Sequence, residues 1–556
     1  MYKTEYEKWM NSPAVDEKTK EELKKMADEE ISDCFYRNLE FGTGGMRGIL
    51  GVGTNRINVY TVRKITQGLA NEIKEIPGGD KKGVVISYDS RKMSEEFAKE
   101  CASVLSANGI MAYVFDSLRA TPELSFAVRY LKCIRGIMIT ASHNPKEYNG
   151  YKIYAGDGCQ LPPEPAERIA GYIDKTDIFA DIKISENPSY KIVGKEIDDA
   201  YINAVLKESL GVKIPENMRV VYTPLHGTGN IPVRRILSEI GVKNAFVVPE
   251  QELPDGDFKT VKSPNPEDSA AMSMAIEYAK RINADLVLGT DPDCDRVGIA
   301  VKNRENEYVC LNGNQTGALM CEFILRKLSE ENRIPKNGTV VKTIVTTDII
   351  EKITAEYGVG TVNVLTGFKY IGEKIGEFEK QGNEERFIFG LEESYGYLKG
   401  TYARDKDAVV ASMLICQMTA DYIAKGKSAY DGMADLYKKY GYSEQLLKTY
   451  TIPGASGAEK IKHVMSSIRN NPFSDIAGFK VIKTEDYENG INNLPKSNVI
   501  KLITENGWIA IRPSGTEPKL KLYFEISGKE KARVKEDMLS VNDDFEKKTE
   551  KIINEG

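Results

Sequence analysis

The fold is decided by the stretch from Gly136 to Lys152, which reads G-I-M-I-T-A-S-H-N-P-K-E-Y-N-G-Y-K. Its first four residues are a short apolar run, which predicts a buried strand. Ser142 follows, and open α/β sheets place their chemistry at the carboxyl ends of strands. His143 and Lys152 can donate to an anion, and Asn144-Pro145 predicts a turn that presents the hydroxyl. If the stretch is considered alone, a plain polar turn is the simpler interpretation. A functional interpretation therefore depends on partner residues elsewhere in the chain.

Apolar runs of the same kind recur along the chain and are separated by helical patterns. The runs form three pairs, at 83–88 with 137–139, 219–222 with 285–288, and 339–345 with 386–389; helical patterns lie at 92–108, 268–282 and 314–332. Strands that alternate with helices indicate parallel α/β units. The second strand of each pair ends in a polar loop, so we predict three related α/β domains that face one cleft.

The two ends of the chain follow other patterns. Residues 16–31 predict one charged amphipathic helix. Near the C-terminus, strands at 499–504 and 508–511 flank Asn506-Gly507, a favoured hairpin turn, and a third strand to 526 and a helix at 529–554 complete an α+β domain. We therefore predict four domains, at 1–210, 211–325, 326–443 and 444–556.

The composition argues against nucleic acid or a membrane as partners. The 76 lysines and arginines are interspersed with 82 aspartates and glutamates, for a net charge of −6. No apolar run approaches the ~18 residues of a membrane span, and the N-terminus lacks the apolar segment of a signal peptide. The eight cysteines form no C-x-x-C pair, which indicates reduced thiols. We expect a cytoplasmic protein.

Asp291, Asp293 and Asp295 are a candidate metal site. In an extended segment, alternate residues project from one side, so the three carboxylates would converge. Such carboxylates repel one another unless a cation neutralises them, and hard oxygen ligands suit Mg²⁺. A solvated acidic turn is the alternative, but the preceding apolar strand favours the metal site. A calcium-binding EF-hand is excluded because the glycine and glutamate of that loop do not follow in register.

Three further segments carry groups suited to a phosphosugar. Residues 512–516 (R-P-S-G-T) offer a guanidinium, two hydroxyls and glycine-exposed amides, which favours phosphate binding over a simple hairpin loop. Glu392, Glu393 and Ser394 can grip sugar hydroxyls, although paired glutamates are also common on surfaces. Residues 41–48 hold four glycines and Arg47, which permits close approach to an anion but is equally compatible with a flexible loop.

Together these motifs resemble those of the α-D-phosphohexomutases, the family that includes phosphoglucomutase and phosphomannomutase. The motifs T-A-S-H-N-P, D-P-D-x-D-R and R-P-S-G-T-E-P stand in the family's order, and the resemblance runs from Phe41 to Lys519. It implies a heart-shaped, four-domain α/β enzyme, with three related α/β domains and a smaller α+β C-terminal domain around one cleft. It also implies an isomerase that transfers a phosphoryl group on a small phosphosugar.

The resemblance further implies roles for individual residues. Ser142 would carry the catalytic phosphate, one oxygen of which would join the three aspartates around Mg²⁺. The family keeps cationic or proton-handling groups at the positions of Arg47, His143, Lys152, Arg296 and Lys406. The substrate-binding candidates are Arg296, Gly367, Lys369, Glu392, Ser394, Arg512, Ser514, Gly515 and Thr516. Among them, Glu392 and Ser394 would hold sugar hydroxyls, and the last four residues would hold the phosphate that is not transferred.

The sugar-binding loop departs from the family's usual pattern. Leu391 stands before the glutamates, and Tyr395-Gly396-Tyr397 replaces the glycine-histidine ending. The second glutamate favours phosphoglucomutase over phosphomannomutase, whereas the tyrosines resemble the branch that also contains phosphopentomutases.

We therefore expect interconversion of α-D-glucose 1-phosphate and glucose 6-phosphate, with glucose 1,6-bisphosphate as intermediate and activator. Phosphopentomutase and phosphomannomutase activities are alternatives within the same class. From other classes, a metal-dependent sugar phosphatase and a non-catalytic sugar-phosphate sensor remain open. The expected assembly is a monomer or a homodimer.

Overall fold

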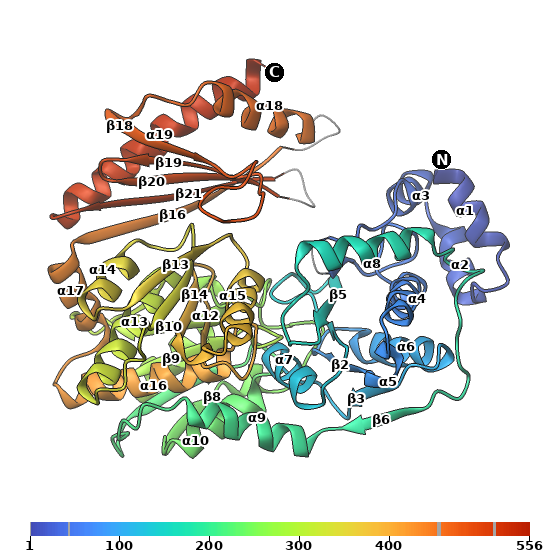
Figure 1. The fold of residues 1–556 in the computed structure, drawn as a ribbon, viewed down its shortest axis with the longest axis horizontal. Helices are drawn as coiled ribbons and strands as arrows, with labels where there is room; N and C mark the ends of the chain where they lie inside the picture. The colour runs from blue at the N-terminus through green and yellow to red at the C-terminus, as the bar shows by residue number, and fades with distance from the viewer. Residues whose placement is uncertain (1, 43–44, 453–456, 515–518, 556) are drawn as a thin grey trace. The chain divides into compact units, whose positions relative to one another are not determined.

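The computed structural model describes residues 2–42, 45–452, 457–514 and 519–555 of the chain, which forms two compact units (Figure 1). Unit 1 comprises residues 1–313, 368–390 and 394–428, and unit 2 comprises residues 314–367, 391–393 and 429–556. The described residues form four β-sheets. In these same ranges, no helix combines the length and the apolar character that a membrane span requires.

The first sheet lies in unit 1 and has the strand order β1-β5-β4-β2-β3-β6. Its strands are β1 (Gly45–Ile49), β2 (Val84–Tyr88), β3 (Ala112–Phe115), β4 (Arg135–Ile139), β5 (Tyr148–Ala155) and β6 (Tyr190–Val193). The strands β2, β3, β4 and β6 run parallel, whereas β5 is antiparallel to β4, and β1 to β5. The predicted pairing of strands 83–88 and 137–139 is confirmed.

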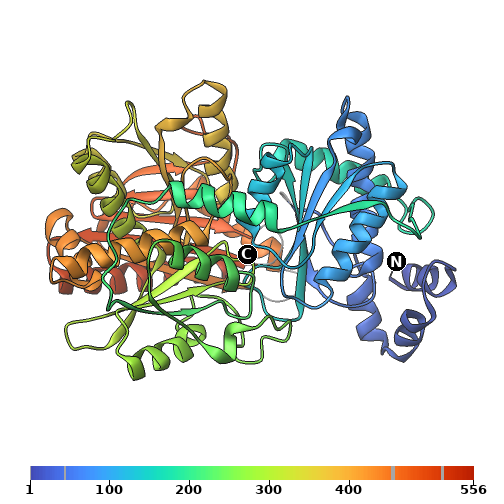
Figure 2. The same ribbon diagram turned by 90° about the horizontal axis from the view of Figure 1, so that it is seen from below.

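Helices cover both faces of this sheet. Successive side chains of a strand point to opposite faces, so neighbouring residues of β4 pack against different helices. Ile137 and Ile139 pack with α4 (Val59–Glu75), α6 (Ser94–Ala107) and α8 (Pro163–Lys175). Met138, between them, packs with α7 (Thr121–Tyr130) and α9 (Lys195–Lys207). The layers are visible in Figure 2, where blue and green helices lie on both sides of the strands of this sheet. The short α5 (Gly79–Lys82) precedes β2. Residues 136–139 are therefore buried on both sides, as their apolar run predicts.

The single helix predicted at 16–31 is wrong. After α1 (Tyr2–Asn11), the segment forms two helices, α2 (Glu17–Lys25) and α3 (Asp28–Phe35). The side chain of Asp16 caps α2 by accepting from Thr19 N, and the Glu30 carboxylate accepts from Ala27 N at 2.9 Å, which starts a new helix. The charged pattern continues through both helices, so periodicity alone does not reveal the break.

The second sheet, also in unit 1, has the order β11-β10-β9-β7-β8. It contains β7 (Arg219–Thr223), β8 (Asn244–Val247), β9 (Leu286–Thr290), β10 (Val297–Lys302) and β11 (Tyr308–Leu311), with helices α10 (Asn230–Glu239), α11 (Pro249–Glu252) and α12 (Ser269–Ile282). The predicted strands at 219–222 and 285–288 are parallel neighbours, which confirms the second α/β unit. The turn between β9 and β10 holds the aspartate motif.

The third sheet has the order β13-β12-β14-β15. Its elements are α13 (Gly313–Glu330), β12 (Thr339–Thr343), α14 (Ile349–Glu356), β13 (Gly360–Val364), α15 (Phe368–Lys380), η1 (Glu384–Arg386), β14 (Phe387–Glu392), β15 (Gly396–Lys399) and α16 (Ala408–Ala424). Within unit 1, α16 contacts α10, β9 and β15, and its residues from Ala408 to Tyr422 are all buried. This helix is apolar all round, as expected of a core helix.

The last sheet belongs to unit 2 and is antiparallel, in the order β16-β21-β20-β19-β18-β17. Its strands are β16 (Tyr442–Thr451), β17 (Asp475–Ile476), β18 (Phe479–Asp486), β19 (Ile500–Thr504), β20 (Gly507–Pro513) and β21 (Lys519–Gly528); α17 (Ala429–Tyr440), α18 (Gly457–Asn470) and α19 (Lys531–Glu555) accompany them. Helices α18 and α19 share a core with the strands, which confirms the predicted α+β organisation.

The predicted hairpin is present, but its turn lies one residue earlier than Asn506-Gly507. Thr504 pairs with Gly507, so Glu505 and Asn506 form the turn and Gly507 opens β20. A Cβ atom on Gly507 would lie 1.8 Å from the carbonyl oxygen of Glu525 on β21. The glycine is therefore required for close strand approach, not for the turn.

Candidate active site

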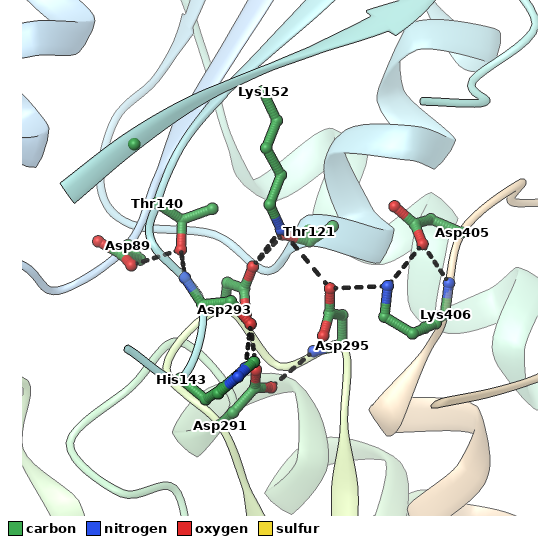
Figure 3. Close-up of polar contacts among 12 residues, drawn as sticks. Asp89, Thr121, Thr140, His143, Lys152, Asp291, Asp293, Asp295, Asp405 and Lys406 are labelled. Carbon is green, nitrogen blue, oxygen red and sulfur yellow. Dashed lines mark hydrogen bonds and ion pairs between the residues drawn. The ribbon is translucent and has the colours of Figure 1, made fainter. Parts of the chain in front are cut away.

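Ser142 lies in the loop after β4 and is only 3% exposed. Its Oγ donates to Asp291 Oδ2 at 2.8 Å, across 149 residues of sequence, and lies 3.1 Å from Nδ1 of His143. Figure 3 shows His143 beside Asp291. The φ angle of Ser142 is +53°, a left-handed conformation that is uncommon for a residue with a side chain. The structure thus brings the serine loop of the first sheet onto the aspartate turn of the second.

The three aspartates converge, but through a tight turn and not through the extended segment that the sequence suggests. Asp291 Oδ1 accepts from the backbone amides of Asp295 at 3.1 Å and Arg296 at 3.0 Å, and Cys294 adopts φ +55°. The turn places one oxygen of each of the three buried carboxylates within 4.8 Å of the others. Convergence therefore depends on a turn that Asp291 itself closes.

Two lysines partly balance the charge of this turn. Lys152 Nζ lies 2.8 Å from Asp293 Oδ2 and 3.7 Å from Asp295 Oδ2, and Lys406 Nζ lies 3.2 Å from the same Asp295 oxygen. Although burial opposes it, the Lys152 ammonium lowers the pKa of Asp293. Burial and then the charges of the other two aspartates raise the pKa of Asp291 well above its ordinary value. Arg296 Nε adds a longer ion pair, 3.9 Å from Asp295 Oδ1, and the pKa of Asp291 is raised in spite of these three cationic groups.

The donor set fits a hard divalent cation. Asp293 Oδ1 and Asp295 Oδ1 are buried and accept no hydrogen bond from any described residue. A buried acceptor without a partner is unfavourable, and Mg²⁺ prefers carboxylate oxygens of this kind. The second oxygen of Asp293 is already engaged by Lys152 and by the Thr121 hydroxyl at 3.0 Å. The turn thus leaves one oxygen on each of two aspartates available for a metal.

Lys406 is positioned by the start of α16. Asp407 caps this helix by accepting from the amides of Val409 and Val410, which fixes the preceding residues. The Lys406 ammonium lies 3.1 Å from Asp405 Oδ1, and Tyr154 donates to the other oxygen of Asp405 at 2.7 Å. The predicted lysine is therefore at the aspartate turn, held by the buried carboxylate of Asp405.

Arg47 and His143 lie beside the serine. Arg47, on β1, donates to Asn144 Oδ1 at 2.8 Å in the serine loop, whereas neighbouring residues 43 and 44 of the glycine-rich stretch lie outside the described residues. Burial, followed by the positive charges of Arg296 and Arg47, holds the pKa of His143 well below its usual range. The imidazole is therefore neutral at pH 7.

Arg296 follows the aspartate turn and forms an ion pair with Glu267. Its backbone bridges to Gly396, and Val297 N donates to Tyr395 O at 3.2 Å. These contacts place the end of the predicted sugar-binding loop, from Ser394 onward, beside the aspartate turn within unit 1. Lys369 lies in α15 of the same unit, and its carbonyl accepts from Cys159 Sγ at 3.3 Å.

The remaining substrate-binding candidates belong to unit 2. Thr343 donates to Glu393 at 3.1 Å at the end of β14, and Gly367 adopts φ +119° in the loop before α15. Burial and then the charge of Glu393 raise the pKa of Tyr523, a hydroxyl that also lies close to Arg512 and Glu392. Tyr523 therefore links the sugar-binding and phosphate-binding candidates of this unit.

The predicted phosphate loop is described only in part. Arg512 pairs with Lys521 across β20 and β21, and Ser514 N donates to Lys519 O at 2.7 Å. Gly515 and Thr516 lie outside the described residues.

Several residues that position the site were not singled out from the sequence. Asp89 and Arg91 follow β2 directly, and the rule that identified Ser142, polar residues at the end of a buried strand, could have found them. Thr121 at the start of α7, and Glu267 before α12, carry no such signal. They reach the aspartate turn only through tertiary packing.

Four regions of the chain match the phosphoglucomutase/phosphomannomutase family. The matches are to its alpha/beta/alpha domain I over residues 38–178, domain II over 199–305, domain III over 312–440, and its C-terminal domain over 465–541. A phosphoglucomutase of Staphylococcus saprophyticus is 38% identical over 516 residues, which cover 90% of this chain and 92% of the relative. A phosphoglucomutase of Staphylococcus aureus is 38% identical over 528 residues, or 92% and 94% of the two chains.

Solved structures show the same fold at lower identity. A phosphoglucomutase/phosphomannomutase family protein from Burkholderia thailandensis matches with a TM-score of 0.69 and 18% identity, over 93% of this chain and 98% of the other. Parafusin, a phosphoglucomutase from Paramecium, matches with a TM-score of 0.68 and 18% identity, over 93% and 95%. With the four domains and these relatives in view, the resemblance inferred from the motifs is confirmed: the chain belongs to the phosphoglucomutase/phosphomannomutase family.

Proposed function

We propose that this chain is a phosphoglucomutase, which interconverts α-D-glucose 1-phosphate and glucose 6-phosphate through a phosphoserine at Ser142. The observation that carries the proposal is the 2.8 Å contact between Ser142 Oγ and the buried aspartate turn. The 38% identity to phosphoglucomutases over 90% of the chain supports the choice of glucose phosphates.

The proposed reaction moves one phosphoryl group out and another back. The bond from Ser142 Oγ to phosphorus breaks as a sugar hydroxyl attacks, which gives glucose 1,6-bisphosphate. The other phosphate of this bisphosphate then returns to Ser142. Lys152 and Lys406 supply positive charge where charge develops in phosphoryl transfer, and the burial of Ser142 limits hydrolysis of the phosphoserine by water.

Asp291, Asp293 and Asp295, with one phosphoserine oxygen, would hold Mg²⁺, which supplies electrostatic stabilisation of the transferred group when bound. His143 is neutral and its Nδ1 lies 3.1 Å from Ser142 Oγ, so we assign it to accept the proton of the serine hydroxyl when the phosphate returns to Ser142. Arg47 lies at the same loop as a cationic group for the phosphate.

Substrate binding is assigned to residues of both units. In this proposal Glu392 and Ser394 hold sugar hydroxyls, and Arg512, Ser514, Gly515 and Thr516 hold the phosphate that is not transferred. The other proposed substrate contacts are Arg296, Gly367 and Lys369. The same proposal divides the chain into functional domains at 1–210, 211–325, 326–443 and 444–556.

Tyr397, at the end of the sugar-binding loop, does not favour a pentose. Tyr397 is 1% exposed, its hydroxyl donates to Gly313 O at 2.9 Å, and its ring stacks on Phe389. This tyrosine is a packing residue, so its presence gives phosphopentomutase activity no support. Glucose phosphates remain the proposed substrates.

The test is a coupled assay of wild type and Ser142→Ala on glucose, mannose, glucosamine and ribose 1-phosphates, with and without Mg²⁺ and glucose 1,6-bisphosphate. We expect the highest kcat/KM for glucose 1-phosphate, dependence on both additions, and loss of at least about 10³-fold in kcat for the variant. Near-normal turnover by the variant would refute the phosphoserine. Release of inorganic phosphate without isomer formation would indicate a phosphatase, and binding without turnover a sensor.

A further inference from the structure

The left-handed backbone at Ser142 has to be held by its surroundings. A serine at φ +53° is strained, and such conformations persist at functional sites only where neighbouring groups fix them. The strain sits at the residue whose hydroxyl faces Asp291, so a relaxed backbone would turn that hydroxyl away. A neighbouring side chain must therefore hold the backbone of Ser142 in this conformation.

One guanidinium contacts four carbonyls of the serine loop. Arg91, three residues after β2, donates through one terminal nitrogen to the carbonyl oxygens of Ser142 at 2.6 Å and Asn144 at 2.5 Å. Its other terminal nitrogen donates to those of Pro145 and Tyr148, both at 2.9 Å. The planar fork of arginine is suited to several fixed acceptors at once. A single side chain thus determines the path of residues 142–148.

The amide of Ser142 is fixed by the same network. Ser142 N donates to Thr140 Oγ1 at 2.8 Å, and Thr140 Oγ1 donates to Asp89 Oδ2 at 2.6 Å. The Asp89 carboxylate lies 3.3 Å from Arg91 Nε, and both of these side chains are fully buried. Arg91, Asp89 and Thr140 therefore close a ring of contacts that starts at the carbonyl of Ser142 and returns to its amide.

Arg91 is also screened from any substrate. The Phe258 ring lies 5.0 Å from its guanidinium, and the arginine is 3% exposed. All four acceptors of its terminal nitrogens are backbone carbonyls of the serine loop. Its charge is consequently directed at the loop and not at a sugar phosphate.

We propose that Arg91 is a positioning residue for phosphoryl transfer, which holds Ser142 in its left-handed conformation so that the hydroxyl faces the aspartate turn. This inference rests on the proposed function and adds a residue to it. Loss of the fork would leave the aspartate turn in place but release the serine, and displacement of a reacting group by about 1 Å can cost on the order of 10²-fold in rate.

Arg135 provides a matched control at the opposite end of β4. It is also buried, forms an ion pair with Glu72 at 2.7 Å and donates to a single carbonyl, that of Ile134. Arg91→Met and Arg135→Met each remove a buried guanidinium from a buried carboxylate that keeps other partners, the Thr140 and Ser94 hydroxyls for Asp89 and Arg168 for Glu72. Both substitutions destabilise the domain, but only the first releases the serine loop.

The readout is the single-turnover transfer of phosphate from glucose 1,6-bisphosphate to the dephosphorylated chain of residues 1–556 in Mg²⁺, measured by intact mass. We expect Arg91→Met to slow this transfer about 100-fold and Arg135→Met to change it by less than about threefold. Arg91→Lys keeps the charge beside Asp89 but lacks the fork, so we expect transfer about tenfold slower than in wild type. Melting temperatures of all variants are measured alongside.

Transfer by Arg91→Lys and Arg91→Met at the rate of Arg135→Met would overturn the inference. If Arg91→Met does not fold, Arg91→Lys and Thr140→Val test the inference instead. Thr140→Val removes the acceptor for the Ser142 amide. Slow transfer by both variants supports the inference, and transfer as fast as in the control overturns it. A wild type that takes up no phosphate would overturn the proposed function, and this inference with it.

Discussion

Strained single residues mark the loops of unit 1 that carry the candidate site. Ser142, Cys294 and Tyr395 adopt φ angles of +53°, +55° and +62°, one in each of the serine loop, the aspartate turn and the sugar-binding loop. None of them is a glycine, so each conformation is unfavourable in isolation. Strain of this kind is expected where a loop must present a group that relaxed backbone would not.

Thr121 gives a prediction for the metal site at this scale. Its hydroxyl donates to Asp293 Oδ2 at 3.0 Å, on the oxygen that Lys152 also contacts. Thr121→Val should weaken Mg²⁺ binding about tenfold, because groups that orient a metal ligand contribute on that order to affinity. Isothermal titration calorimetry with Mg²⁺ measures this change in affinity.

The control for this prediction is Thr66→Val. Thr66 is buried in α4, where its hydroxyl donates to Val62 O at 2.8 Å, so the same chemical change is made away from the aspartates. Equal Mg²⁺ affinity in the two variants would contradict the role given to Thr121.

At the scale of elements, the site is built from strand ends and helix starts. The serine loop follows β4, the aspartate turn follows β9, and the sugar-binding loop follows β14. Lys406 precedes α16, and Thr121 is the first residue of α7. Loops anchored on buried strands are held rigidly, which suits groups that must keep fixed distances.

The β19–β20 hairpin of unit 2 carries a buried lysine whose charge should affect stability. Lys501 Nζ donates to Ile344 O at 2.7 Å and lies 4.1 Å from the centre of the Trp508 ring. Burial lowers the pKa of Lys501 from its ordinary 10.5 to about 8. Below pH 8 the folded and unfolded chains both carry the proton, so the penalty of burying the charge is constant.

Between pH 8 and 10.5 only the unfolded chain keeps that proton, so the stability of the folded state rises with pH. Relative to Lys501→Met, the free energy of unfolding of wild type should rise by about 3 kcal/mol across this interval. Denaturant titrations at several pH values measure the difference. Lys480→Met, an exposed position on β18, is the control and should show a flat difference; a flat difference for Lys501→Met would contradict the prediction.

At the scale of the whole molecule, the chain divides into two units with separate hydrophobic cores. Ser142, the three aspartates, Lys152 and Lys406 all belong to unit 1, and Arg512 and Ser514 belong to unit 2. Mg²⁺ alone should therefore stabilise the metal site and leave the described part of the phosphate loop unchanged.

Hydrogen exchange tests this division. Mg²⁺ at about 100 times its Kd should slow exchange of the amides at 291–296 by at least about tenfold, because a ligand stabilises the state that binds it. The β19–β20 hairpin should be unaffected. Asp295→Asn should lose the effect, and protection that persists in this variant would contradict the site.

How far the sequence predicts the fold is clear from particular elements. The apolar run at 136–139, the helix at 92–108 and the hairpin at 499–511 are confirmed because burial and local propensity act in the same direction there. The break between α2 and α3 was missed because the charged pattern continues through both helices. The predicted position of the hairpin turn is one residue too late. Gly507 allows close approach of β21, and no local sequence pattern indicates that contact.

The sequence by itself determined where the candidate groups lie: a serine after a buried strand, three alternating aspartates, and a loop with one arginine and two hydroxyls. Each is recognisable because its chemistry needs specific side chains close together in the chain. Only the tertiary structure decided how Ser142 meets Asp291, which oxygens of the aspartates stay available, and that Arg91 holds the serine loop. These contacts join residues that are far apart in sequence. Their geometry follows from the tertiary packing that brings these loops together, which local propensity does not encode.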